Sequence, residues 1–207
     1  DLIRPQLCEE AMRLGRILAR LSPDDSEVHA LVALMEIQAS RTNARTNRDG
    51  EPVLLLDQDR SRWDQLLIRR GLAALDRAIA LGGENAPYAL QAAIAACHAR
   101  ARKGADTDWT RIAALYATLA RVTPSPVIEL NRAVAVSMAE GPAAALVLID
   151  AIRDDPALRN YHLLYGVRGD LLSKLGRQTE ATLEFRRAAE LTRNERERTY
   201  LLKRAGQ

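Results

Sequence analysis

Prolines and glycines return at nearly regular intervals in the second half of this 207-residue chain. The prolines are 37 and 32 residues apart and the glycines 37 and 35 residues apart: Pro87, Pro124 and Pro156, and Gly104, Gly141 and Gly176. Proline begins a helix readily because its φ is already helical, whereas glycine often ends one. The repeating unit is therefore a helical hairpin, and hairpins repeated about every 34 residues form solenoids.

The last repeat unit carries the clearest side-chain signature. It combines small residues with large apolar ones: Gly169, Leu172, Gly176, Ala181, Phe185, Ala188 and Leu191. This pattern resembles the tetratricopeptide repeat, in which small residues let paired helices approach and large ones fill the space toward the neighbour. Earlier units keep the alanines, as at 91–96 and 143–145, without the aromatic residues. A generic alanine-rich bundle is therefore the alternative.

Apolar residues spaced three and four apart predict about ten helices and no sheet. The composition agrees, because 35 alanines and 31 leucines favour helices over strands. In the first helix Leu7, Ala11, Leu14 and Leu18 form one stripe. The helices are expected at 5–21, 26–41, 63–81, 86–103, 108–122, 126–139, 142–153, 158–175, 178–192 and from 194 onward. The predicted class is all-α: a right-handed solenoid of antiparallel hairpins forming a single domain over 1–207.

The segment 194–207 is expected to cap the last hairpin. Asn194 and Glu197 have the three-residue spacing of a capping box at the start of a helix. We expect Tyr200 and Leu201 to cover the apolar edge of the hairpin. We expect the charged side chains of the segment to face water: Arg196, Arg198 and Lys203.

Charge and motifs argue against several function classes. The net charge is +3, but 30 basic residues are interspersed among 27 acidic ones, so we expect only weak, salt-sensitive DNA binding. The 27 arginines do not recur at matching repeat positions, as an RNA-reading array would require. Two cysteines and the lack of a leader or long apolar run favour a cytoplasmic protein. Cys97 and His98 are helical neighbours pointing apart, so we expect no enzyme, cofactor or metal site.

The segment 42–60 is too long for the connection inside the first hairpin, and such loops are usually functional or disordered. We expect its apolar part, 53–56, to dock against the first helices. The charged string that follows is the candidate protein-interaction site: Asp57, Asp59, Arg60, Arg62 and Trp63. Arginine and tryptophan recur as anchors of interfaces. Two alternatives remain open: the aspartates cap the next helix and pair with the arginines while Trp63 fills the core, or the two aspartates bind a divalent cation.

Several strings together resemble one known family. They are DGE at 49–51 with VLL at 53–55, DQDRSRWD at 57–64, QAAIAACHA at 91–99 and PSPVIELNRAV at 124–134, continued by TDW at 107–109, NYHLL at 160–164 and LGR at 175–177. They are similar to the C-terminal tetratricopeptide-like extension of a group of extracytoplasmic-function RNA polymerase sigma factors of the sigma-70 family.

The resemblance implies a regulatory, protein-interaction domain in bacterial transcription initiation. Its expected partners are the sigma domains of the same chain and the RNA polymerase core. Promoter DNA would be contacted only through sigma domains expected upstream of residue 1, and a chain starting at Asp1 is expected to be a fragment. The alternative is a free-standing tetratricopeptide adaptor unrelated to transcription.

Overall fold

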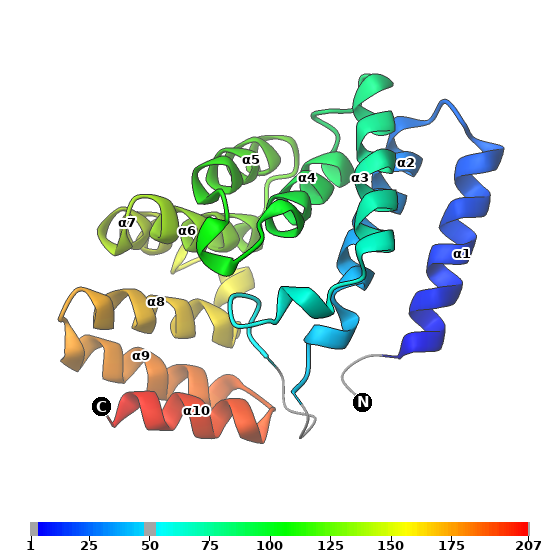
Figure 1. The fold of residues 1–207 in the computed structure, drawn as a ribbon. Helices are drawn as coiled ribbons and strands as arrows, with labels where there is room; N and C mark the ends of the chain where they lie inside the picture. The colour runs from blue at the N-terminus through cyan, green and yellow to red at the C-terminus, as the bar shows by residue number, and fades with distance from the viewer. Residues whose placement is uncertain (1–3, 48–52, 207) are drawn as a thin grey trace. The chain divides into compact units, whose positions relative to one another are not determined.

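A computed structural model describes residues 4–47 and 53–206. These residues form ten α-helices and no β-strand, which confirms the all-helical class (Figure 1). The helices are α1 Pro5–Leu21, α2 Ser26–Ser40, α3 Gln65–Ala80, α4 Pro87–Arg100, α5 Trp109–Val122, α6 Pro126–Ala139, α7 Pro142–Ile152, α8 His162–Lys174, α9 Gln178–Leu191 and α10 Glu195–Ala205. Short 3₁₀ turns occupy Thr42–Ala44, Arg60–Arg62, Gly104–Asp106 and Pro156–Leu158.

The prolines and glycines of the period perform only some of the predicted roles, since Pro87 begins α4 but α6 begins at Pro126 instead of Pro124. Gly141 and Gly176 adopt positive φ angles of 100° and 76°, a conformation that residues with a Cβ avoid. Gly104 is different, because a Cβ there would lie 2.9 Å from the Leu56 carbonyl oxygen, so its role is close packing. Pro156 begins a 3₁₀ turn and α8 starts only at His162, so the helix expected from 158 is shorter.

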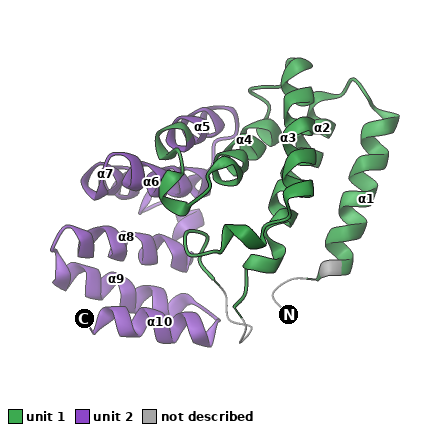
Figure 2. Ribbon diagram, viewed as in Figure 1, with its two compact units in different colours: residues 1–111 green, residues 112–207 purple. Residues whose placement is uncertain are grey.

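The chain forms two compact units, residues 1–111 and 112–207, with α5 crossing the boundary (Figure 2). In the first unit α2 is the central helix and packs against α1, α3 and α4. The core between α2, α3 and α4 is built largely of alanine, and Ala33, Ala78 and Ala92 are fully buried. Helix backbones approach closely here, since a Cβ on Gly71 would lie 2.6 Å from Ile37.

In the second unit α6 pairs with α7 and α8 pairs with α9, as the repeat predicts. Gly169 of α8 faces Phe185 of α9, and a Cβ on this glycine would lie 2.8 Å from the ring. The pairing of α4 with α5 crosses the unit boundary, so it stays a prediction, as do the handedness of the array and a single domain over 1–207.

A nearly buried arginine links three helices of the second unit. Arg168 of α8 donates to Asp150 of α7 at 2.8 Å and also to Glu184 of α9. A guanidinium with two carboxylate partners can be removed from water at tolerable cost, whereas loss of one partner leaves a buried charge uncompensated. The ion pairs therefore hold α7, α8 and α9 in one register.

Helix α10 packs on α9, but its contacts differ in part from those expected. Leu201 is buried, whereas Tyr200 is 52% exposed and does not cover the hairpin. Arg198 does not simply face water, because it donates to the carbonyls of Ala189 and Thr192. Such carbonyls at the end of α9 have no partner within their own helix.

The start of α10 has one of the two predicted capping interactions. Asn194 accepts hydrogen bonds from the backbone N–H groups of Arg196 and Glu197. The prediction of a full capping box is wrong. Glu197 accepts a hydrogen bond from the Thr192 hydroxyl, and the Asn194 N–H donates to that same hydroxyl. The buried Thr192 thus takes the place of the carboxylate.

Two glycines of α8, one turn apart, allow a matched test of close packing. Gly169→Ala places a methyl group against the Phe185 ring and should lower the free energy of unfolding by about 1–3 kcal/mol. Gly166→Ala meets only Leu201 at 3.8 Å and should raise stability by up to about 1 kcal/mol, the helix-propensity gain of alanine. Urea denaturation measures both, and two equal effects would contradict the packing argument.

Candidate interaction surface

The predicted interaction string begins with two exposed aspartates. Asp59 begins the 3₁₀ turn at Arg60–Arg62, accepting hydrogen bonds from the Ser61 hydroxyl at 2.6 Å and the Ser61 N–H at 3.0 Å. These bonds hold the pKa of Asp59 below its usual value. No group of three or more potential metal-ligating side chains occurs in the described part of the chain. The two hydrogen bonds from Ser61 show that Asp59 caps this turn, which agrees with the capping alternative for this residue.

Arg60 points inward and ties this turn to the end of α4. Its guanidinium donates to the carbonyl oxygens of His98 and Ala101, the latter at 3.2 Å, and to the Thr107 hydroxyl at 3.3 Å. It also lies 4.8 Å from the centroid of the Trp63 ring. Partial burial lowers the pKa of Arg60. This arginine therefore acts as a structural tie.

Trp63 is 4% exposed and forms a small core with Ala44 and Ile68. Leu55 packs against this core, whereas Leu54 and Leu56 remain exposed, so the expected docking of 53–56 holds only in part. Arg62 is exposed and donates to the Thr46 carbonyl. The string thus presents Asp57, Asp59 and Arg62 to solvent above the inward-facing Arg60 and Trp63, and its role in binding a partner stays a prediction.

Cys97 and His98 do not form a nucleophile and base. Burial raises the pKa of the Cys97 thiol, which keeps it protonated. Burial, together with the positive charges of Arg60 and Arg41, lowers the pKa of His98 to about 4. The His98 ring instead packs edge-on against Trp109, with ring centroids 5.2 Å apart. Both residues act as packing groups at the end of α4.

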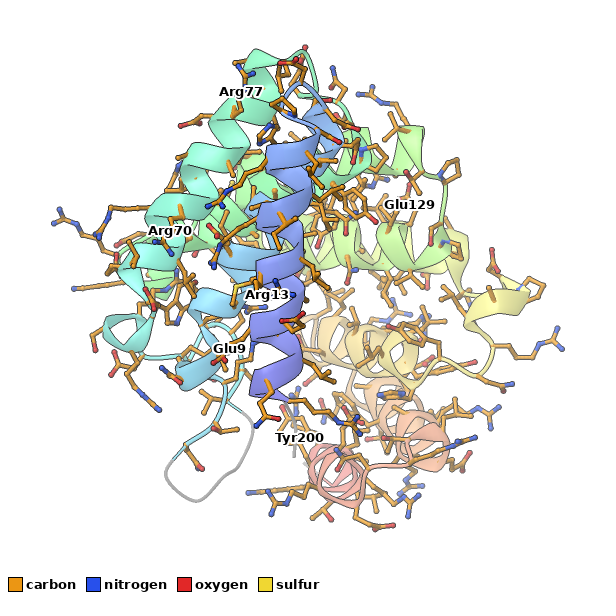
Figure 3. The ribbon with its side chains drawn as sticks, turned by 90° about the vertical axis from the view of Figure 1, so that its right-hand side faces the viewer. Glu9, Arg13, Arg70, Arg77, Glu129 and Tyr200 are labelled. Atoms are coloured by element: carbon orange, nitrogen blue, oxygen red, sulfur yellow. The ribbon has the colours of Figure 1, made fainter. Side chains whose placement is uncertain are left out.

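The leucine stripe of α1 is exposed, although amphipathic spacing usually marks the buried face of a helix. Figure 3 looks onto α1 from outside, with Glu9 and Arg13 labelled. The helix packs on α2 through its other flank, where a Cβ on Gly15 would touch Val32 and Met35. Arg16 secures this contact by an ion pair of 2.7 Å with Glu36, which is buried.

The exposed stripe has the spacing of a helix–helix seam. Leu7 and Leu21 are 59% and 76% exposed, and the stripe between them advances in alternating steps of four and three: Leu7, Ala11, Leu14, Leu18 and Leu21. That spacing keeps apolar side chains on one line along a partner helix. We call these five residues the α1 stripe. One sequence signal could have indicated this exposed stripe. The apolar residues of α1 occupy a wider arc of the helix surface than a single contact with α2 can cover.

Known proteins match this chain in sequence. Residues 1–79 match the model of DUF6596, a family of unknown function. The chain is also 46% identical over 199 residues to an uncharacterized protein of Rhizobium meliloti (strain 1021), covering 96% of this chain and 46% of that protein. It therefore spans less than half the length of this relative. No solved structure matches the chain.

The DUF6596 region contains α1, α2, the long connection and nearly all of α3. It thus includes both the α1 stripe and the string at 57–63. None of the described helices is long and apolar enough to cross a membrane.

Two arginines on either side of Ser61 distinguish a structural role of the string from a contact role. Arg60→Met should lower the free energy of unfolding by about 2 kcal/mol, because the carbonyls of His98 and Ala101 lose a charged donor. Arg62→Met should change it by less than about 0.5 kcal/mol, since Arg62 is exposed and makes one such bond. Equal melting temperatures for both variants would contradict the structural role of Arg60.

His98 should make stability depend on pH. Below pH 6.5 the unfolded chain binds a proton that the folded chain refuses until about pH 4, so acid favours unfolding across this interval. The wild type should lose about 2 kcal/mol more than His98→Gln between pH 7 and pH 4. Denaturant titrations at several pH values measure this difference, with His29→Gln as the control. Parallel curves for wild type and His98→Gln would show that His98 is not held neutral.

Proposed function

We propose that this chain is the C-terminal regulatory and protein-interaction domain of an extracytoplasmic-function RNA polymerase sigma factor. In this role it modulates promoter-specific initiation through contacts with sigma domains of its own chain or with the polymerase core. The observation that carries the proposal is the α1 stripe, an exposed apolar seam with helix-pairing spacing on a helix already fixed to α2.

The family resemblance supports the transcriptional part of the proposal. Its strings extend from 49 to 177, which overlaps the end of the DUF6596 region and covers most of the hairpins that follow. The relative from Rhizobium meliloti is more than twice as long as the matched segment, so it has room for further domains. In the proposed role the protein acts in the bacterial cytoplasm, contacts promoter DNA only through other domains and has no catalytic activity.

Asp57, Asp59 and Arg62 are proposed to contribute a polar part of the interface, because they are exposed. Arg60 and Trp63 would hold this part in place from beneath. Charged groups at the rim of a protein interface are usual. The alternative function, a free-standing tetratricopeptide adaptor, would use the same surface for a partner outside transcription.

Binding measurements test the proposal. The purified chain should bind bacterial RNA polymerase core, or the part of the Rhizobium meliloti protein outside the matched 199 residues, in biolayer interferometry. Leu14→Ser combined with Leu18→Ser should weaken that binding at least about tenfold, because the seam loses two apolar anchors. The double variant should remain folded, since both side chains are exposed.

The matched control replaces two exposed apolar residues away from α1. Val147 of α7 and Leu183 of α9 are 69% and 62% exposed, and their double serine variant should bind as the wild type does. No binding to either partner would favour the adaptor alternative. Binding that both double variants retain would place the interface elsewhere on the chain.

A further inference from the structure

A pocket of about 450 Å³ lies between the start of α1 and the end of α2, entirely within the first unit. Its walls are mostly apolar and come from both helices: Leu7, Ala11, Met12, Met35 and Ala39. The volume is within the range of small-molecule sites. Two of the wall residues are methionines, whose flexible side chains adapt to apolar ligands of varied shape. The pocket can therefore hold an apolar group of modest size.

One end of this pocket is positively charged. The polar part of its lining consists of Arg4, Gln38, Thr42 and Arg45, with no acidic side chain from the described residues. Arg45 donates to the Gln38 side-chain oxygen and to the Gln38 carbonyl, both at 3.3 Å. Its buried Nε atom has no hydrogen-bond partner among the described residues. A guanidinium has five N–H donors, so Arg45 keeps donors available for an anion.

A second arginine lies beside Arg45. Arg41 donates to the same Gln38 oxygen, at 2.7 Å, so a neutral amide serves two cations. Burial, and then the positive charges of Arg45 and Arg60, lower the pKa of Arg41 to about 10. Among the described residues, neither Arg41 nor Arg45 forms an ion pair with a carboxylate. Neighbouring, partly buried cations attract an anion more strongly than a single exposed one does.

We propose that the pocket binds an amphipathic anion, namely a medium-chain carboxylate of about ten carbons. The carboxylate accepts hydrogen bonds from Arg45, with Arg4 nearby, and the alkyl chain lies between α1 and α2 against Met12 and Met35. Arginine suits this role because its planar group can bind both oxygens of a carboxylate. Leu7 and Ala11 of the α1 stripe also line the pocket, whereas Leu14 and Leu18 do not, so ligand binding can be tested separately from the serine variants of the proposed interface.

Calorimetry with decanoate below its micelle concentration tests the proposal. Decanoate should bind at least about tenfold more tightly than decanol, which lacks the charge, and butyrate, which lacks the chain. Arg45→Met should abolish the preference for decanoate over decanol, whereas Arg69→Met, an exposed arginine of α3, should leave it unchanged. Ala11→Phe should block both ligands by filling the pocket from an exposed helix position.

Location and ligand source are tested separately. Cys8 lines the pocket, so decanoate should slow its alkylation by iodoacetamide, while the buried Cys97 serves as the internal reference. Equal affinity for decanoate and decanol, binding that survives Ala11→Phe, or no binding at all would overturn the proposal. Binding to phosphatidylglycerol vesicles without binding to free decanoate would overturn it too. If circular dichroism shows that Arg45→Met is unfolded, two other measurements test the proposal: the affinities of the wild type for decanoate and decanol, and the loss of binding in Ala11→Phe.

Discussion

Close approach of helix backbones is the constraint on which the rest of this structure depends. The core is rich in alanine and contains one phenylalanine, so each buried side chain removes little apolar surface from water. Such a core is stable only if it is dense, and density requires glycine where two helices meet. Gly71 brings α3 against Ile37 of α2, and Gly169 admits Phe185 between α8 and α9. The guanidinium of Arg204, 4.7 Å from the Phe185 ring centroid, closes the same contact from α10.

The central position of α2 determines what remains for α1. Because α3 and α4 occupy much of the surface of α2, α1 contacts it along one flank and leaves the α1 stripe in water. The Arg16–Glu36 pair fixes this arrangement, since a buried carboxylate without its cation is strongly unfavourable. The same geometry leaves the pocket open between the start of α1 and the end of α2. The stripe and the pocket are therefore two consequences of one incomplete helix contact.

Local chemistry is what the sequence predicts well, and long-range packing is what it predicts poorly. The bounds of α1 and α6 agree with the predicted 5–21 and 126–139, because proline positions and apolar spacing are local signals. The exposure of Leu14 and the burial of Trp63 depend on which elements pack over them. Periodicity shows which face of a helix is apolar, but it does not show which element packs against that face. A local prediction also fails where two partners compete, since Glu197 accepts from the Thr192 hydroxyl instead of the Asn194 N–H. The inward turn of Arg60 depends on the carbonyl of Ala101, which lies 41 residues away.

The features suited to binding lie within residues 1–79, the part of the chain that matches DUF6596. They are the α1 stripe and the apolar pocket with Arg45 in its lining. The exposed leucines lower the stability of the isolated fold, because their apolar surface stays in water. The second unit differs, since Arg168 there is satisfied by two carboxylates and the hairpins bury Phe185. A division of labour follows from this contrast: the hairpins of the second unit supply stability, and the first unit holds surfaces whose free energy improves when something binds to them.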